Sequence, residues 1–360
     1  MKVLMVSDMI MHGGAVHTRF LSRELMSNGA DVGIFSYTRA SEPGIATSTA
    51  KSLRFPFMFY QLCLDKAGFF KILNRAGPDI VHMHHCAGSL ELSIDKIRRM
   101  GIPVVGTVHI SPSGSSVFDR MIGLYFTRLL REKLRESDRV ISVSRHIEER
   151  LNEIGVENTV TIPNGIDPRT FFRVEGARET LFIPQDELSL LYVGRLSPEK
   201  GIFMLLKAFK RLKARNKKLY IIGSGPLGSF CRAYSRLNRD VVFLGRVRES
   251  DLRLYYSSAD LTLSPSLWNE AFGMVLIESM ACGTPPVASG LGAIPEIVKD
   301  GRNGFIARDL SPDGFARKIT EAMDSDLKAV GRQGERFVSQ RFYWSTIAGM
   351  TMKLYRSVLS

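Results

Sequence analysis

A chain of 360 residues exceeds what one typical hydrophobic core supports, so two domains are expected. The 44% share of hydrophobic residues is ordinary for a globular protein, and no stretch approaches the roughly 20 apolar residues of a membrane span. The net charge of +13 alone would allow nucleic acid as a partner, but the sequence has no recognition motif of that class, so we expect none.

The N-terminus and the cysteines both indicate where the protein resides. The first apolar run, Val3–Val6, has the length of a strand and is too short for the core of a signal peptide. The four cysteines are scattered without a paired spacing, which is typical of reduced thiols. We therefore expect a cytoplasmic protein, which its basic surface could also bring to the inner face of the membrane.

Residues 1–172 are predicted to form one Rossmann-like domain. Short apolar strands alternate there with helical stretches, the pattern of a parallel sheet covered on both faces. A helix over Arg19–Asn28 is expected to end at Gly29. The expected strands are Val3–Val6, Asp31–Phe35, Ile80–His84, Val104–Val108, Arg139–Val143 and Thr159–Ile162.

A second Rossmann-like domain is predicted over residues 173–341, after the polar segment that begins at Arg173. An amphipathic helix over 342–360 is expected to follow it and to pack back on the first domain. The fold class is thus α/β, with two doubly wound domains facing across a cleft and ligands beyond the carboxyl ends of the strands. The expected strands are Leu190–Val193, Leu219–Ile222, Val241–Leu244, Leu261–Ser264, Pro286–Ala288 and Gly304–Ala307.

A group of polar residues at the end of the third predicted strand resembles a set of metal ligands: His82, His84, His85 and Cys86. On a strand, His82 and His84 share one face while His85 points to the other. The sequence offers no second cluster to complete a coordination sphere. We therefore interpret these residues as polar side chains at a strand end and expect no metal site.

The most informative stretch holds two glutamates, Glu270 and Glu278, on either side of Phe272-Gly273. A helix starting near Phe272 would direct unpaired N–H groups at whatever precedes it, which suits a diphosphate. Glu278 would lie two turns further on and could accept two vicinal hydroxyls, although it could also be an ordinary carboxylate on an amphipathic helix. The neighbouring pattern of strands, glycine-rich turns and helices favours a site for a nucleotide-linked sugar.

A pair of cations, Arg195 and Lys200, flanks a predicted strand-to-helix turn that begins at Gly194. They could be surface charges, but a cation at a helix N-terminus is unfavourable, so an anionic ligand is the better interpretation. Arginine grips phosphate with two hydrogen bonds and lysine acts as a point charge. We predict that the pair neutralises the diphosphate of a nucleotide-linked ligand without a metal ion.

These features belong to a series of motifs that resembles the retaining GT-B glycosyltransferases of glycosyltransferase family 4, the glycosyl transferases group 1. The resemblance covers nearly the whole chain. Its departures are Ser279, Pro286 and Gly292-Ala293, which lie near the expected donor pocket and leave the sugar open. The matching motifs are Gly13-Gly14-Ala15, Pro78–His84, Thr107-Val108-His109, Val143-Ser144, Ile162–Asp167, Val193–Gly201, Ile222–Pro226, Gly245–Val247 and Glu270–Glu278.

The resemblance implies roles for further residues. The Gly13-Gly14 loop would meet the phosphate or the acceptor, and His109 would lie beside the transferred sugar. Glu270 would bind sugar hydroxyls, although the sequence cannot exclude that it is a covalent nucleophile. The remaining donor contacts would be Gly194, Gly223, Arg246, Val247, Phe272, Gly273, Met274 and Val275, of which Gly223 could belong to a turn only.

The expected activity is retaining transfer of a hexose-type sugar from a UDP- or GDP-linked donor to a hydroxyl acceptor. That acceptor could be a sugar, a small molecule, a lipid-linked group or a cell-envelope glycan precursor, and no cofactor besides the nucleotide sugar is expected. One alternative is a nucleotide-sugar epimerase on the same fold, but epimerases lack the two charged pairs. A phosphorylase would need a lysine for pyridoxal phosphate, and the intact charged set argues against a non-catalytic binding protein.

Basic and aromatic residues mix in two segments of the first domain, Lys51–Tyr60 and Arg120–Arg139. Both segments could be helices that pack on the core, or a surface that docks on anionic lipid and presents a lipid-linked acceptor. A third basic run, Lys207–Lys218, is predicted to continue an amphipathic helix as a solvated face. The inward residues of that helix would be Leu205, Leu206, Phe209 and Leu212.

Overall fold

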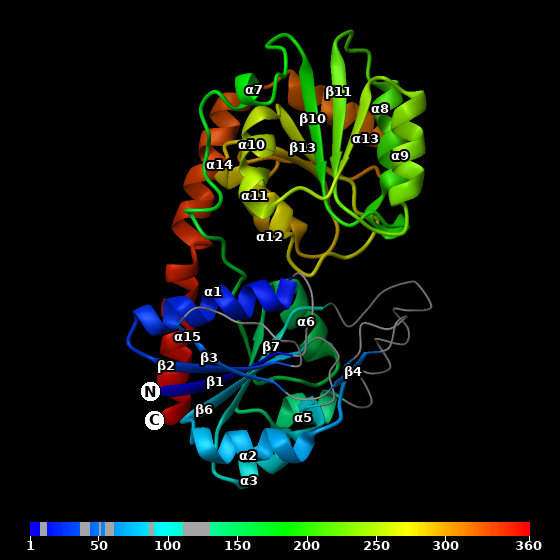
Figure 1. The fold of residues 1–360 in the computed structure, drawn as a ribbon. Coiled ribbons are helices and arrows are strands. Elements are labelled where there is room, and N and C mark those ends of the chain that lie inside the picture. The colour runs from blue at the N-terminus through cyan, green and yellow to red at the C-terminus, as the bar shows by residue number, and fades with distance from the viewer. Residues whose placement is uncertain (8–12, 37–43, 50–51, 55–60, 86–89, 111–129) are drawn as a thin grey trace. The chain divides into compact units, whose positions relative to one another are not determined.

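The computed structural model describes residues 1–7, 13–36, 44–49, 52–54, 61–85, 90–110 and 130–360, which divide into two compact units (Figure 1). Unit 1 contains Met1–Gly165 and Trp344–Ser360, and unit 2 contains Ile166–Tyr343. The division thus falls at 165/166, earlier in the chain than the expected boundary at 172/173. A backbone hydrogen bond of 2.7 Å from Ile166 N to Phe342 O joins the two ends of unit 2.

Unit 1 is built on a parallel sheet with the strand order β3-β2-β1-β6-β7-β8-β9. All six strands predicted for this part of the chain are present. The edge strand β3 was not predicted, because its sequence Ala-Thr-Ser-Thr has no apolar run. The strands are β1 (Lys2–Ser7), β2 (Asp31–Ser36), β3 (Ala46–Thr49), β6 (Ile80–His85), β7 (Val104–Val108), β8 (Arg139–Ser142) and β9 (Thr159–Thr161).

Helices cover both faces of this sheet (Figure 1). Strand β1 sends Val3 and Met5 into the core under α1 and α15, and Leu4 and Val6 into the core under α2 and α3. This two-residue alternation fills both faces of a buried parallel sheet. The helices of unit 1 are α1 (Gly13–Ser27), α2 (Lys66–Ala76), η1 (Leu90–Ser93), α3 (Ile94–Arg99), α5 (Arg131–Glu136), α6 (Arg145–Glu153) and α15 (Trp344–Leu359).

The last helix, α15, belongs to unit 1 although it follows unit 2 in the sequence. It packs against α1, where the Trp344 ring stacks on Phe20 with centroids 6.0 Å apart. A side chain at Gly165 would collide with the same ring, since a Cβ there would lie 2.6 Å from it. At the other end of the helix, the Tyr355 hydroxyl lies 2.5 Å from Nδ1 of the buried His82.

Helix α1 begins earlier than predicted, at Gly13 instead of Arg19. Gly13 and Gly14 therefore form its first turn and are not part of a loop. The expected N-terminus was misplaced because two successive glycines indicate a turn, whereas here they lie within a helix that packs on β1 and α15.

The two basic and aromatic segments lie largely outside the described residues. Within the first, Ser52–Arg54 forms strand β4, paired antiparallel with β5 (Gln61–Cys63). In the second, the helix α5 ends at Glu136 and the predicted strand β8 begins at Arg139, so the described part of the segment is helical only as far as Glu136. Leu130 and Leu134 are fully buried, which supports core packing for this part of the segment.

Unit 2 is built on a second parallel sheet, with the order β12-β11-β10-β13-β14-β15. All six predicted strands are present. The strands are β10 (Leu188–Val193), β11 (Lys217–Ile222), β12 (Val241–Gly245), β13 (Leu261–Ser264), β14 (Pro286–Ser289) and β15 (Phe305–Ala307). The helices are α7 (Ala177–Thr180), η3 (Pro198–Lys200), α8 (Ile202–Arg211), α9 (Gly228–Leu237), α10 (Glu249–Ser258), α11 (Met274–Ala281), α12 (Ile294–Ile297), α13 (Pro312–Met323) and α14 (Leu327–Arg341).

Helix α8 confirms the predicted inward face: Leu205, Leu206 and Phe209 are buried in the helix, and Leu212 is buried just after it. The helix ends at Arg211, however, so the basic run does not continue as helix. Lys217 instead lies in β11 and donates from Nζ to the carbonyl oxygens of Phe209 and Leu212 at the C-terminal end of α8. Such a cation is favourable at that end of a helix.

Each sheet has one place where the strand order reverses direction. In unit 1, β2 and β3 lie on one side of β1, and β6 to β9 lie on the other side. In unit 2 the same reversal lies between β10 and β13. In doubly wound sheets, ligands bind beyond the carboxyl ends of the strands at this switch point, which directs attention to the residues after β10 and β13.

Candidate functional site

The switch point of unit 2 brings together two residues that the sequence placed on different motifs. Lys200 follows β10 and Glu270 follows β13, and their Nζ and Oε1 atoms lie 2.5 Å apart. Their side chains are 29% and 17% exposed, so the ion pair is half-buried but open to solvent. The predicted cation and the predicted sugar-binding carboxylate are therefore neighbours at the edge of one sheet.

Two glycines position the loops that carry this ion pair. Gly201, beside Lys200, has a φ of +73°, and a Cβ there would lie 2.0 Å from Pro265 O in the loop after β13. Gly292 has a φ of +60°, and a Cβ there would lie 2.6 Å from the backbone nitrogen of Glu270. Only glycine allows both the left-handed conformation and this approach of backbones. The loops after β10, β13 and β14 therefore converge at the same edge.

Two helices begin at this edge with no side chain to cap them. Helix α8 starts after Gly201, and α11 starts after Gly273, which has a φ of +109°. The expected start near Phe272 is thus two residues too early, because Gly273 in the left-handed conformation serves as the N-cap. Neither helix has an acidic residue in its first turn. Both helix ends can therefore stabilise an anion.

The remaining predicted donor contacts of unit 2 lie around the same edge. Gly194 N donates to Ile222 O at 3.0 Å, and Gly223 N donates to Gly245 O at 2.7 Å, so the ends of β10, β11 and β12 are tied together. Further predicted contacts differ in exposure. Arg195 and Arg246 are exposed, Val247, Met274 and Val275 are partly buried, and Phe272 is buried against Phe342.

Glu278 lies on α11, one face of which packs on α10. Its Oε2 accepts a hydrogen bond of 2.8 Å from the hydroxyl of the buried Tyr256. Burial raises the pKa of Glu278 to about 7, against the opposing effect of that hydrogen bond. The carboxyl therefore exchanges its proton near neutral pH, and one of its oxygens already has a partner.

The departures from the family pattern do not all lie where the sequence suggested. Ser279 is fully buried, and its Oγ lies 2.7 Å from both Thr262 Oγ1 and Thr284 O, so that it donates to the carbonyl and accepts from the threonine hydroxyl. Pro286 is buried at the start of β14. These two residues belong to the interior of unit 2, so their side chains are not exposed to a ligand, and their nearness to the donor pocket stays a prediction. Gly292, in contrast, contacts the backbone of Glu270 directly.

In unit 1, His109 comes just after β7 and is partly buried, with Nε2 3.0 Å from Nδ1 of His84. The sequence did not single out His17 on α1, whose Nδ1 lies 2.8 Å from Asn164 Oδ1. Burial lowers the pKa of His17 to about 4, outweighing the effect of Asn164. Its place three residues after Gly14 was the only signal that could have indicated it.

Among the described residues, no helix is long and apolar enough to cross a membrane.

Comparison with known families matches both halves of the chain. Residues 11–170 match the model of Glycosyltransferase Family 4, and residues 174–337 match that of Glycosyl transferases group 1. The phosphatidyl-myo-inositol mannosyltransferase of Mycolicibacterium smegmatis is 30% identical over 78% of this chain and 71% of its own length. The lipopolysaccharide 1,2-N-acetylglucosaminetransferase of Salmonella typhimurium is 33% identical over 56% of each chain.

Solved structures show the same fold at low sequence identity. Sucrose-phosphate synthase from Thermosynechococcus elongatus superposes with a TM-score of 0.81 at 23% identity, over 99% of this chain and 98% of that chain. HepE from Anabaena, solved in complex with UDP and glucose, gives a TM-score of 0.80 at 20% identity, over 99% of this chain and 100% of that chain.

Proposed function

For this chain, which belongs to glycosyltransferase family 4 and has the GT-B fold, we propose transfer of a hexose-type sugar from a nucleoside diphosphate donor with retained anomeric configuration. It is a glycosyltransferase, so the open points are its donor, its acceptor and its mechanism. The observation that carries the proposal is the Lys200–Glu270 ion pair at the switch point of unit 2, between two uncapped helix N-termini.

The donor would be a UDP- or GDP-linked sugar bound to unit 2. Its diphosphate would lie at the N-termini of α8 and α11, where Arg195 and Lys200 add positive charge. Glu278 would accept from the ribose hydroxyls, and the backbone at Arg246-Val247 would hold the base. The HepE complexes with UDP and with UDP-glucose support this choice, since they share the fold.

The chemistry requires stabilising the negative charge that develops on the leaving diphosphate as the glycosidic bond breaks. Lys200, Arg195 and the two helix ends supply fixed positive charge for this step, so no metal ion is needed. In same-face transfer, the leaving phosphate oxygen takes the proton of the acceptor hydroxyl. When the donor binds, Lys200 would leave its ion pair with Glu270 and contact the phosphate. Glu270 would then accept hydrogen bonds from sugar hydroxyls. From the family resemblance, His109 of unit 1 remains a candidate contact of the sugar.

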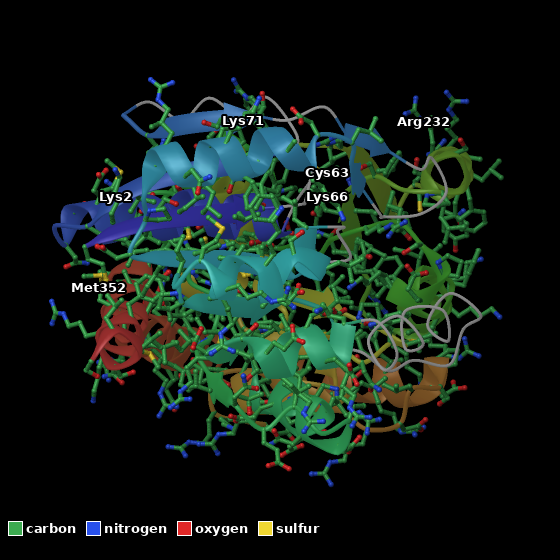
Figure 2. All side chains as sticks on the ribbon, turned by 90° about the horizontal axis from the view of Figure 1, so that it is seen from below. Lys2, Cys63, Lys66, Lys71, Arg232 and Met352 are labelled. Atoms are coloured by element: carbon green, nitrogen blue, oxygen red, sulfur yellow. The ribbon has the colours of Figure 1, made fainter. Side chains whose placement is uncertain are left out.

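The acceptor would be a lipid-linked group or an envelope glycan precursor. The names of two relatives specify phosphatidyl-myo-inositol and lipopolysaccharide as acceptors, which supports this class. Unit 2 also has a basic aromatic face on α8 and α9, which together carry five basic residues and no acidic one. The exposed rings of Phe203 and Phe230 lie 5.0 Å apart on that face, and Figure 2 shows Arg232 extending from α9. Peripheral binding to anionic lipid would bring the enzyme to such an acceptor.

The test is incubation of the purified full chain with a panel of UDP- and GDP-linked sugars, with release of nucleoside diphosphate followed by chromatography. We expect slow hydrolysis of one donor, unchanged in EDTA, and loss of it in Lys200→Met. The matched control is Lys318→Met, which removes an ion-paired lysine of α13 instead. A reversible epimerised product would indicate the epimerase, and activity that requires added magnesium or manganese would contradict the metal-free mechanism.

A further inference from the structure

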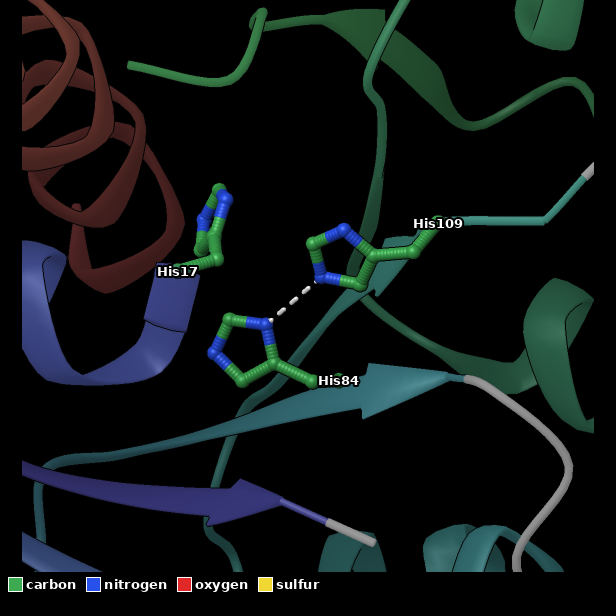
Figure 3. Close-up of side chains that lie close together, drawn as sticks. All are labelled: His17, His84 and His109. Atoms are coloured by element: carbon green, nitrogen blue, oxygen red, sulfur yellow. Dashed lines mark hydrogen bonds between the residues drawn. The ribbon is translucent and has the colours of Figure 1, made fainter. Parts of the chain in front are cut away.

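Three histidines converge in unit 1 from three separate elements (Figure 3). His17 comes from α1, His84 from the end of β6, and His109 from the residue after β7. Strands β6 and β7 are hydrogen-bonded neighbours at the carboxyl edge of the sheet, so their terminal side chains meet there. One ring nitrogen of each histidine lies within 4.8 Å of the corresponding atoms of the other two.

The spacing is close to that of a coordination sphere. Tetrahedral zinc, with Zn–N distances near 2.0–2.1 Å, places its nitrogen ligands about 3.3–3.4 Å apart. His84 Nδ1 and His109 Nε2 lie 3.0 Å apart, and the rings of His17 and His109 meet edge to face with centroids 4.7 Å apart. Side-chain movement of about an ångström would bring all three nitrogens to a common cation.

The surroundings of the cluster fix its rings in a way that suits coordination. The Asn164 side-chain oxygen accepts from Nδ1 of His17, which leaves the lone pair of that ring on Nε2. Metal-binding histidines commonly donate their second ring N–H to such an oxygen. His82, in contrast, has both ring nitrogens occupied by Tyr355 and Thr107, and it stacks on His84 at 4.5 Å. His82 is therefore a support for the cluster and not one of its ligands.

We propose that His17, His84 and His109 form a binding site for a transition-metal cation of the zinc class, with a fourth position left for water or another ligand. Three neutral imidazoles favour Zn²⁺, Cu²⁺ or Ni²⁺ over Mg²⁺ and Ca²⁺, which prefer oxygen ligands. The proton shared between His84 and His109 moves to the other nitrogen of its ring, or leaves to solvent, when the cation binds. The sequence suggested no such site, because His17 and His109 are far from His84 in the chain.

Occupation of this site would block His109 as a contact of the transferred sugar, so the cation would act as an inhibitor. This second step rests on the proposed function, whereas metal binding itself does not. The binding experiment therefore contains neither donor nor acceptor, and its outcome is independent of the reaction.

The experiment is competition for Zn²⁺ between the full chain and a chromophoric chelator, repeated with Co²⁺ to record the visible bands of a tetrahedral site. We expect one equivalent of bound metal in the wild type and binding weaker by at least about tenfold in His17→Gln and in His84→Gln. The matched control is His146→Gln on α6, outside the cluster, which should bind as the wild type does. Thermal unfolding checks that each variant is folded.

Equal binding by the wild type and the two cluster variants, with all three folded, would overturn the proposal, as would the absence of binding in the wild type. Protection of the chain against thermal unfolding by Zn²⁺ but not by Mg²⁺, lost in His84→Gln, would support it. Inhibition of donor hydrolysis by Zn²⁺ that is reversed by EDTA then tests the second step. If binding occurs without inhibition, the metal site stands and the sugar contact of His109 is wrong.

Discussion

At the scale of single residues, the molecule pairs the cation that we assign to the phosphate with the carboxylate that we assign to the sugar. Lys200 and Glu270 form an ion pair with Nζ and Oε1 2.5 Å apart, so their charges neutralise each other. A half-buried pair of this kind keeps both side chains near their working positions. It also means that a variant of one partner leaves the other without its counter-charge, so the two residues cannot be studied independently.

Replacing Lys200 with Met should lower turnover by a factor of about 10² to 10³, the usual effect of removing one group that stabilises developing negative charge. Arg195→Ala should lower it in the same direction, because the exposed arginine follows the same strand. The measurement is steady-state kinetics with the donor identified by the panel. Near wild-type turnover in both folded variants would contradict the assignment of these cations to the diphosphate.

From the raised pKa of Glu278 we predict that donor binding depends on pH. Its pKa of about 7 means that the carboxyl is largely protonated at pH 6, and a protonated carboxyl accepts fewer hydrogen bonds from ribose hydroxyls. Donor affinity should therefore fall by up to about fivefold from pH 7 to pH 6, whereas Glu278→Gln should bind more weakly and without this slope. Calorimetry with the nucleotide sugar measures the donor affinity at each pH. Because the diphosphate diester does not titrate in this range, a change in affinity reports on the protein.

The raised pKa of Glu278 also predicts a pH dependence of stability: protonation of this carboxyl should weaken donor binding but stabilise the fold. A carboxyl whose folded pKa is raised from 4.5 to about 7 holds a proton that the unfolded chain loses, so the free energy of unfolding falls as pH rises between these values. Glu278→Gln should remove that slope. At pH 8 the variant should be more stable than the wild type, by about 1–3 kcal/mol. Chemical denaturation at pH 5 and pH 8 checks the sign.

At the scale of elements, the site depends on how closely the loops at the carboxyl edge approach one another. Lys200 and Glu270 meet because Gly201 lies against Pro265 and Gly292 lies against the backbone of Glu270. The strands and helices supply the frame, but the contact between two loops sets the position of the charged groups. Glycines at such contacts are therefore as important for the site as the charged residues themselves.

Gly292→Ala should reduce turnover by about 10²-fold while leaving unit 2 folded. The new Cβ would lie 2.5–2.6 Å from backbone atoms of Glu270, and displacing a catalytic loop by about an ångström has an effect of this size. The matched control is Gly228→Ala in α9, where a Cβ would meet nothing within 4 Å. Wild-type turnover in the Gly292 variant would show that the loop can shift without cost to the reaction.

At the scale of the whole molecule, the net charge of +13 is spread over both units, and among the described residues α8 and α9 combine a pair of exposed aromatic rings with five cations. Phe203 and Phe230 are 43% and 38% exposed. An exposed aromatic pair among basic side chains is typical of a surface that inserts at the boundary of an anionic bilayer.

The protein should sediment with anionic vesicles and remain in the supernatant with neutral ones, and binding should weaken with salt. Lys207→Glu with Lys210→Glu should reduce the bound fraction at least about tenfold, because each basic residue near the surface contributes about 1 kcal/mol. The control with the same change of charge is Lys328→Glu with Arg332→Glu on α14. Equal losses in both double variants would indicate that net charge, and not this face, determines binding.

Local patterns in the sequence were sufficient to predict the family, the two Rossmann-like units and twelve of the strands, because apolar runs and glycine turns can be recognised without tertiary contacts. The sequence also named Lys200, Glu270 and Glu278. Only the tertiary structure joined Lys200 to Glu270, moved the start of α1 to Gly13, and placed Ser279 in the interior. It also brought His17 and His109 to His84. Distances between residues remote in the chain depend on strand order and loop packing, which no local pattern encodes.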